Sequence, residues 1–514
     1  MIKLKQKTNT ASFSERVTDI YIFAMLFAFP LFTGFKGYTE VTLSKYIFFV
    51  SASTLWLVLL FAAAIKDKIR LRLSKTSLVG IFVLMYIVFC CASAVFSPFR
   101  SSVLLGEGRF DGLVTTLLCA GIFFGVSRFG RVKKSYIFAA ALAVSLNCIV
   151  ALLQILGFNP LHLFPGSYNF YDAGFQFSST FLGTIGNADL FSAYICLMLP
   201  FCCAYYISAA KRPLILLVPS FLCALCLFKS GVSGGILALA ATALMAAPFI
   251  ISSGERLRRA LEIACLILIS VFLAISVITA EAADAVTVSF SFSRTSLILL
   301  ILAVFAAGSR LALKRSDFPR KMLRLFFSAA GIAIFVSGLV AAYYWKGTSG
   351  TIYELSQLLH GRAQDSFGSS RILIWRKALA LVPDRLLFGG GPGTLALRLD
   401  VSFSRFVEET GKTLSSSVDN AHNEYLGILV NTGLLSLAAY LAAQAVSLYR
   451  AAKSAVFSEF CCCFACALLC YWIQAFFGLG LFLVSPLMWL FWGLYISSLR
   501  RKRTHIPENE SEHS

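Results

Sequence analysis

One histidine stands where a long apolar segment begins. His422 lies within Asp419-Asn420-Ala421-His422-Asn423-Glu424, and an apolar run starts directly after it. The first turn of a helix presents unpaired N–H groups and the positive end of the helix dipole, and Asn420 is a suitable capping residue. This field favours a neutral imidazole, which can accept a proton. We therefore expect His422 to act as a general base.

Two carboxylates flank this histidine. Glu424 and Asp419 are close enough in the sequence to orient a ring nitrogen of His422, and Glu424 could instead be the base itself. A histidine at a helix end is more often structural than catalytic, so the spacing alone leaves the structural interpretation open. The remaining histidines have no comparable setting: His162, His360, His505 and His513.

An arginine upstream has the chemistry to bind an anion. Arg371 lies one helical turn before Trp375, so the two share a face, and a helix predicted over 371–382 places Arg371 at its N-terminus, with the preceding serines as caps. Arginine binds phosphate oxygens bidentately, and a helix N-terminus attracts anions. The alternative is that Arg371 pairs with Asp365 or with a lipid headgroup.

The composition indicates a membrane protein. Of the 514 residues 58% are hydrophobic and only 14% are charged, and the mean hydropathy is +0.79. A soluble domain is nearer half apolar. Apolar runs of about 17 to 25 residues, each long enough to cross a ~30 Å hydrocarbon layer as a helix, recur along the chain. The predicted fold class is all-α: a polytopic membrane protein with about fourteen transmembrane helices and one large helical extracytoplasmic loop.

The positions of Lys and Arg predict the topology. Basic clusters follow every second apolar run, and positively charged loops remain on the cytoplasmic side. The formal charge of +20 therefore reports orientation in the cytoplasmic membrane and not nucleic-acid binding. The expected parts are a cytoplasmic N-terminus (1–16), a first membrane part of about eleven helices (17–344), an extracytoplasmic loop (345–422), the last membrane helices (423–499) and a cytoplasmic tail (500–514).

The 345–422 loop is expected to be a small helical cap. Its first helix, 371–382, stops before Pro383. A tight turn at 389–393 follows, and 394–409 is predicted to form a second, amphipathic helix. None of the 15 cysteines lies in the loop, and no CxxC pair in the chain has the partners that a zinc site needs. The sequence therefore predicts neither a disulfide-linked domain nor a metal site.

The basic residues predicted on the outer side require a binding partner that explains them, because positive charge is disfavoured there. They include Arg109 and Lys229, the latter in the short connection Phe228-Lys229-Ser230-Gly231. A lipid-linked diphosphate is an anion of the outer leaflet, so we expect the outer basic residues, among them Arg371, Lys229 and Arg109, to bind such a diphosphate. For Lys229, a lysine that snorkels to the membrane edge is an equal alternative.

Several segments between roughly residues 100 and 440 form a recognisable combination: Ala421-His422-Asn423-Glu424-Tyr425-Leu426 followed by Asn431-Thr432-Gly433-Leu434-Leu435, Ser370-Arg371 with Trp375, Leu387-Phe388-Gly389-Gly390-Gly391-Pro392-Gly393, Gly183-Thr184-Ile185-Gly186-Asn187 with Tyr194 and Pro200, and Gly106 to Gly112 around Arg109. In combination, these segments resemble the O-antigen ligase and polymerase superfamily.

The resemblance implies a metal-independent, inverting membrane glycosyltransferase without a cofactor. Its partners would be an undecaprenyl-diphosphate-linked glycan donor, a hydroxyl acceptor on a glycan, lipid or protein, and the lipid bilayer. The family's histidine matches His422, and one diphosphate-binding arginine matches Arg371. A second family arginine usually lies in a Ser-Arg-Gly-like segment, but Val232-Ser233-Gly234-Gly235 lacks it. Lys229, about one turn away, is expected to substitute.

Two other functions stay open. A lipid-linked oligosaccharide flippase or another polysaccharide transporter can have a similar number of spans, but would place charged groups nearer the bilayer midplane, with paired halves and broken helices. A scaffold protein would leave the outer basic residues unexplained. Ligase, polymerase and protein-glycosylating subtypes share the motifs above, so the sequence does not identify the acceptor or the sugar.

Overall fold

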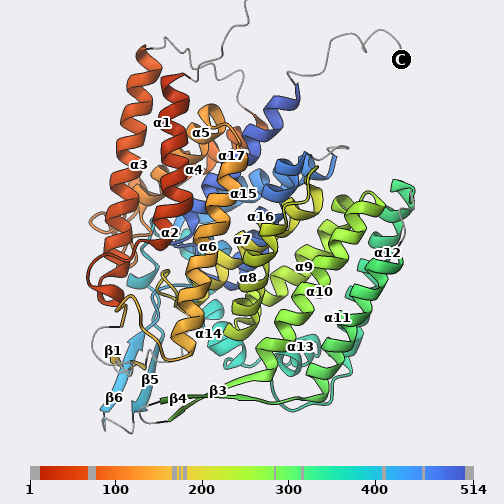
Figure 1. Ribbon diagram of the computed structural model, residues 1–514. Helices are drawn as coiled ribbons and strands as arrows, with labels where there is room; N and C mark the ends of the chain where they lie inside the picture. Colours follow the sequence, from red (N-terminus) through yellow and green to blue (C-terminus); the bar gives the residue numbers. More distant parts are fainter. Residues whose placement is uncertain are drawn as a thin grey trace, which may run out of the picture.

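Over the residues that it describes, the computed structural model of the protein is a bundle of long helices with three small β-hairpins (Figure 1). The residues that it describes are 12–66, 77–164, 171–172, 175–176, 182–282, 285–313, 318–407, 412–453 and 458–503. The helices of the first half are α1 (Phe13–Phe23), continued through a π-helical turn (Ala24–Ala28) into α2 (Phe29–Leu31), then α3 (Val41–Lys66), α4 (Leu78–Phe96), α5 (Leu113–Phe129), α6 (Lys134–Ile155), α7 (Ala188–Ser208), α8 (Leu217–Ser230) and α9 (Ser233–Ile250).

The second half adds helices and the longer hairpins. The helices are α10 (Gly254–Ser276), α11 (Arg294–Ala312), α12 (Arg320–Tyr343), α13 (Thr351–Leu359), α14 (Phe367–Ala380), α15 (Glu424–Lys453), α16 (Glu459–Gln474) and α17 (Ser485–Arg503). The antiparallel hairpins are β1 (Tyr171–Asp172) with β2 (Phe175–Gln176), β3 (Val277–Ala282) with β4 (Ala285–Phe290), and β5 (Ser402–Val407) with β6 (Lys412–Ser417).

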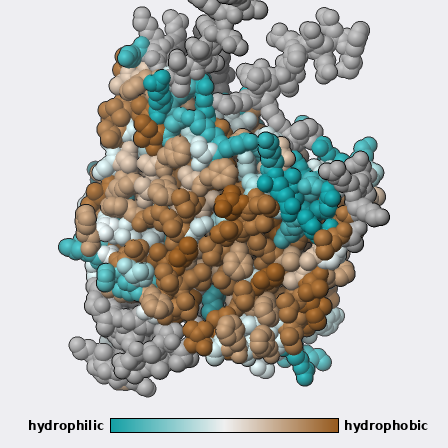
Figure 2. Space-filling model, viewed as in Figure 1, coloured by the Kyte–Doolittle hydropathy of each residue, from teal (hydrophilic) through white to brown (hydrophobic). Residues whose placement is uncertain are grey.

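The predicted class is confirmed in its main point, because the chain is predominantly helical and many helices are apolar enough to span a membrane. Among the described residues, ten helices have the length and hydropathy for this: α3, α4, α6, α7, α9, α10, α11, α12, α15 and α16, while α5 and α8 are shorter and apolar. Hydrophobic residues cover most of the middle of the face in Figure 2, and hydrophilic residues gather toward the two ends. The number fourteen stays a prediction.

Helix α7 is the centre of the bundle. Its apolar window is entirely buried, and it packs against α16, α8 and α9. Helix α12, by contrast, is almost entirely exposed at the edge of the bundle in Figure 1, as expected for a helix whose surface faces lipid. The N-terminus of α7 is therefore fixed by packing on several sides, and it reaches the end of the bundle where α14 and the hairpins lie.

The β-hairpins and the short helices α13 and α14 gather at one end, which we call the loop end (Figure 1). Helix α1 begins, and α17 ends, at the opposite end. The loop end contains most of the residues between α12 and α15, the segment predicted to be extracytoplasmic. The side of the membrane that this end faces stays a prediction.

The predicted second helix over 394–409 is wrong. Over the described part of this range, 394–407, one 3-10 turn (Leu395–Leu397) is helical, and the chain then forms the hairpin of β5 and β6, with Ser402 opposite Ser417. The strand sequences SFSRFV and KTLSSS are rich in serine, threonine, valine and phenylalanine. Serine competes with helical hydrogen bonds, and β-branched and aromatic residues favour strands, which explains the difference.

Helix α15 is interrupted by a glycine, and the 389–393 turn packs into the break. Gly433 adopts φ +86°, outside the helical region. The N–H of Gly390 donates to the carbonyl of Val430 at 3.1 Å, and the N–H of Gly391 donates to the carbonyl of Asn431 at 2.7 Å. Two motifs that are far apart in the sequence therefore form one joint between the loop end and the membrane helices.

Candidate functional site

His422 occupies the turn between β6 and α15. Its φ is +47°, and its backbone N–H donates to Asn420 Oδ1 at 3.1 Å. Asn420 was the predicted cap of the following helix, but Asn423 has this role, because its Oδ1 accepts from the N–H of Leu426 at 3.0 Å. The histidine is therefore held in a left-handed turn one residue before the cap.

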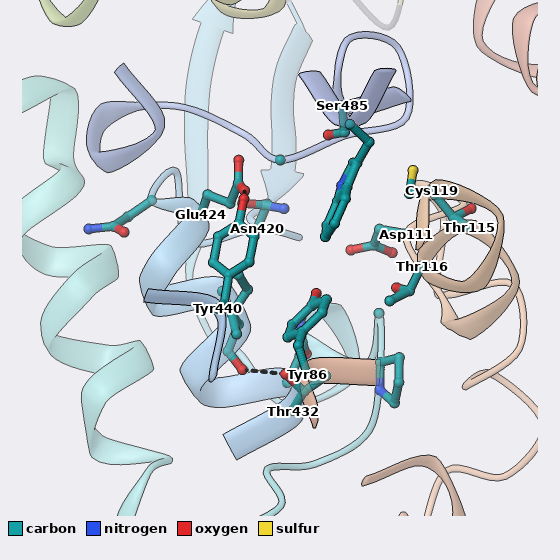
Figure 3. A pocket seen from close by; sticks show the side chains of 18 residues that line it. Tyr86, Asp111, Thr115, Thr116, Cys119, Asn420, Glu424, Thr432, Tyr440 and Ser485 are labelled. Carbon is teal, nitrogen blue, oxygen red and sulfur yellow. Dashed lines mark hydrogen bonds between the residues drawn. The ribbon is translucent and has the colours of Figure 1, made fainter. Parts of the chain in front are cut away.

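This turn separates two sets of side chains. Asn420, Asn423 and Glu424 line a cavity of about 110 Å³ between α4, α5, α15 and α17 (Figure 3). His422 is not among the residues that line this cavity, and its Nδ1 lies 3.7 Å from Oδ2 of Asp189. The imidazole therefore faces the N-terminus of α7, and its neighbours face the interior.

Arg371 begins the regular part of α14. The three residues before it, Gly368, Ser369 and Ser370, have φ of +62°, +58° and +65°, and regular helix then continues to Ala380. The predicted helix from Arg371 is thus present and ends slightly earlier than expected. The serines do not cap it with their side chains as predicted, and form a left-handed turn instead. Such residues cost about 1–3 kcal/mol each, so the surrounding fold must hold the turn in place.

Asp189 joins the arginine and the histidine. It lies in the first turn of α7, which is capped by Asn187 through a hydrogen bond of 3.0 Å from the N–H of Leu190. Its Oδ2 is 3.6 Å from Nη2 of Arg371 and 3.7 Å from Nδ1 of His422. These separations are ion-pair distances slightly longer than a hydrogen bond. The structure thus brings the two principal predicted residues to one carboxylate.

The side chains of Arg371, Asp189 and His422 are partly exposed to solvent. Their exposed fractions are 17% for Arg371, 26% for Asp189 and 31% for His422. Partial desolvation strengthens the interactions between these charged groups. The alternative partner considered for Arg371, Asp365, is wrong, because Asp365 pairs with Arg376.

Trp375 ties α14 to the histidine turn. Its Nε1 donates to the carbonyl oxygen of Ala421 at 3.0 Å, and its ring packs edge-to-face on Phe476 at 5.4 Å between ring centroids. Arg371 lies one turn earlier on the same helix. One helix therefore positions the guanidinium directly and the imidazole through the adjacent carbonyl.

Arg109 lies beside the same segment. Its Nε is 2.6 Å from Oδ2 of Asp419, so Asp419 binds the arginine, and no hydrogen bond or ion pair joins it to His422 in the described part of the chain. The next residue, Phe110, has φ +53° and stacks on Tyr46 at 4.2 Å between ring centroids. Arg109 also lines a cavity of about 380 Å³ that reaches Asn187 at the N-terminus of α7.

Glu424 lies apart from the imidazole. Its carboxylate accepts hydrogen bonds from Tyr440 Oη at 2.7 Å and from Tyr471 Oη at 3.2 Å. Within the described residues no hydrogen bond or ion pair connects Glu424 to His422. In this structure Glu424 therefore neither orients the ring nor shares its surroundings.

The cavity that Glu424 lines contains a second carboxyl group. Figure 3 shows Asp111, Thr115 and Thr116 on one side and Glu424 and Tyr440 on the other. Oδ1 of Asp111 is buried without a hydrogen-bond partner, and burial raises the pKa of Asp111 to about 6. This cavity is polar and is lined by Glu424, the alternative candidate for the base, but not by His422.

Lys229 is also outside the group around Asp189. It lies in the last turn of α8, and its Nζ donates to the carbonyl oxygen of Val277, the first residue of β3. This bond ties the short connection between α8 and α9 to the neighbouring hairpin. The alternative of a lysine at the membrane edge agrees better with this contact than a position against the diphosphate.

Sequence reasoning missed Asp189, although a signal was present. The segment Gly183–Asn187 had been singled out for its resemblance, and it ends in a capping asparagine with an acidic residue in the first turn of an apolar helix. The same pattern occurs at Asn423 and Glu424. A search for every asparagine-capped apolar helix with an acid in its first turn would have found both.

This geometry defines a class of protein: a helical membrane protein with an arginine, a carboxylate and a histidine grouped at one end of its bundle. Residues 281–441 match the family model described as O-antigen ligase, which confirms the resemblance to the O-antigen ligase superfamily and points to a membrane glycan ligase or polymerase. The matched segment contains Arg371 and His422, whereas Asp189 and Arg109 precede it. No curated protein matches the chain.

Proposed function

We propose that the protein is a membrane glycosyltransferase that transfers a glycan from an undecaprenyl-diphosphate-linked donor to an acceptor hydroxyl at the outer face of the cytoplasmic membrane. The observation that carries this proposal is the approach of His422 and Arg371 to one carboxylate. A proton acceptor and an anion receptor side by side are what the transfer of a glycan from a diphosphate requires. The family match supports the same class.

The donor diphosphate binds Arg371, with Arg109 beside it. Arginine offers a planar set of donors that matches phosphate oxygens, and Arg371 stands at the start of a helix whose first N–H groups add to its positive field. The cavity of about 380 Å³ next to Arg109 gives a phosphorylated headgroup room to approach the N-terminus of α7. The undecaprenyl chain then extends along the apolar surface of the bundle.

The reaction is a single displacement. The Nε2 atom of His422, opposite the nitrogen that faces Asp189, accepts the proton of the acceptor hydroxyl. The hydroxyl oxygen forms a bond to the anomeric carbon while the bond from that carbon to the diphosphate oxygen breaks, and the bonding electron pair leaves with the diphosphate. Attack from the opposite face inverts the anomeric configuration. The arginines stabilise the charge that develops on the leaving group, so this route calls for no metal or cofactor.

The proposal leaves Glu424 and Lys229 outside the reacting group. The Glu424 carboxylate is held by two tyrosines in the interior, and Lys229 is bonded to a backbone carbonyl of β3. Both sets of contacts support a structural role for Glu424 and Lys229. Their contribution to transfer is therefore indirect.

Transport is less well supported by the same structure. A flippase uses broken helices to expose backbone groups to its substrate near the bilayer midplane. Helix α15 is broken at Gly433, but the carbonyls of Val430 and Asn431 accept hydrogen bonds from Gly390 and Gly391. The break therefore serves the joint with the loop end.

Turnover by the purified protein in detergent tests the proposal. The protein is mixed with lipid-linked oligosaccharide and candidate acceptors, and product is measured where no compartment exists, so that transport alone gives none. His422→Ala should abolish product, because the base is removed. His360→Ala is the matched control, because His360 lies at the same end but stacks on Tyr343. Substantial turnover by His422→Ala would refute the role of His422 as the base.

A further inference from the structure

We propose that Asp189 is a positioning residue that changes partner during the reaction. In the free protein its carboxylate stands at the anion site of Arg371, and the arriving diphosphate displaces it toward His422. This inference rests on the proposed function and deepens it, because it couples the binding of the donor to the orientation of the base.

The distances place Asp189 between its two partners. The same oxygen, Oδ2, is 3.6 Å from the guanidinium and 3.7 Å from the imidazole, and neither contact is a hydrogen bond. Within the described residues, no hydrogen bond holds the carboxylate in this position. A movement of less than about 1 Å toward either side makes one full hydrogen bond and lengthens the other contact.

Charge decides the direction of the movement. A diphosphate carries more negative charge than a carboxylate and matches the fork of Arg371 bidentately, so it wins the competition for the guanidinium. The carboxylate and the diphosphate repel each other. Asp189 sits at the N-terminus of α7, where a negative charge is favourable, and the side chain can turn from Arg371 to His422 while its backbone stays in place.

The new contact prepares the histidine for its task. A carboxylate at Nδ1 holds a proton there, which leaves Nε2 free to accept the proton of the acceptor hydroxyl. It also stabilises the imidazolium that forms when the proton arrives. The base therefore reaches its reactive orientation only with the donor in place, which limits the activation of water in the empty site.

The partner change predicts opposite effects on binding and on chemistry in Asp189→Asn. Removal of the competing charge should lower the donor KM by about two- to fivefold, the range that partly exposed ion pairs contribute. Loss of the oriented imidazole should lower kcat by about 100-fold or more. The kcat of Asp189→Glu should lie between those of the other two proteins, because a carboxylate is restored on a longer side chain.

A binding measurement separates this inference from the proposed function. Undecaprenyl diphosphate, which carries no glycan, is titrated into His422→Ala and into His422→Ala/Asp189→Asn, where no turnover interferes. The double variant should bind more tightly by the same two- to fivefold factor, because only the competition at Arg371 differs. Asp365→Asn is the control, because that carboxylate pairs with Arg376 on the exposed side of α14, and it should leave both KM and kcat unchanged.

Each contrary result has one meaning. Unchanged kcat in Asp189→Asn, or unchanged or weaker binding of undecaprenyl diphosphate, overturns the partner change and leaves the proposed function standing if His422→Ala is inactive. A rise of KM together with a fall of kcat indicates a static ion pair and also overturns it. If Asp189→Asn fails to accumulate, Asp189→Glu carries the test, and wild-type kcat and KM in that variant overturn the inference.

Discussion

At the scale of single residues, backbone strain marks the site more clearly than any motif. Within the described residues, five positions other than glycine have positive φ: Phe110, His162, Ser369, Ser370 and His422. Four of these are His422 itself or lie within two residues of Arg109 or Arg371. Left-handed backbone is costly for residues with a Cβ atom and persists where the fold enforces it, often at functional sites. The left-handed positions therefore lie at or next to the candidate residues Arg109, Arg371 and His422.

Asp111 makes the stability of the protein depend on pH. Burial raises its pKa from 3.8 to about 6, so the folded state binds its proton more tightly than the unfolded state does. The stability that the protonated group contributes is complete below about pH 4 and is lost as the pH rises through about 6. Asp111→Asn should therefore stabilise the protein at pH 8 by about 1–3 kcal/mol and make little difference near pH 4.

Thermal unfolding in detergent from pH 4 to pH 8 checks this dependence. The charged neighbours are Arg109 and Asp419 on the loop end and Glu424 across the cavity, and all three remain in the variant. Asp365→Asn, at an exposed position, serves as the control and should shift the melting temperature little at any pH. A gain for Asp111→Asn that is equal at all pH values would contradict the assignment.

At the scale of elements, the joint between the 389–393 turn and α15 determines where the loop end sits. A Cβ atom on Gly433 would lie 2.2 Å from the carbonyl oxygen of Leu387, and the φ of +86° is itself unfavourable for alanine. Gly433→Ala should therefore destabilise the protein by about 2–4 kcal/mol and lower glycan transfer. Both effects have the same cause, because the joint also places the segment that precedes His422.

Helix α15 supplies its own control for this variant. A Cβ atom on Gly427 meets nothing within 4 Å, so Gly427→Ala should leave the melting temperature and the transfer rate close to those of the unchanged protein. Both variants are compared by thermal unfolding and by product formation in detergent. Equal behaviour of the two would show that the joint does not need a glycine.

The sequence predicts the elements of the site better than their mutual arrangement. Apolar runs of membrane length, the histidine at a helix mouth and the shared face of Arg371 and Trp375 all depend on local periodicity, which is legible in a single chain. Asp189 lies more than 180 residues before Arg371, and only the packing of α7 in the centre of the bundle brings them together. The direction in which the Glu424 side chain points depends on the rotation of α15 about its own axis in the bundle, and the local sequence does not specify this rotation.

At the scale of the whole molecule, the predicted topology has a direct test. Helix α7 runs from Asp189 at the loop end to the opposite end, so Lys211, just after this helix, and Ser415 in β6 lie at opposite ends. A membrane-impermeant maleimide added to intact cells should label Ser415→Cys and leave Lys211→Cys unlabelled until the membrane is permeabilised. Both changes are made in a chain whose partly exposed Cys91 and Cys265 are replaced by serine. Labelling of Lys211→Cys alone would reverse the orientation.

The hydrogen bonds from Gly390 and Gly391 to α15 also limit which segments related proteins can exchange during evolution. A loop transplanted from a relative would arrive without the partners of its glycine turn unless the first half of α15 came with it. We therefore expect homologues to exchange the whole stretch from the glycine turn through Gly433. Recombination within this stretch should yield chains that insert into the membrane but do not form the joint between the glycine turn and α15. Single substitutions are expected to be tolerated more readily in the β5–β6 hairpin, which lies within that stretch but takes no part in the joint.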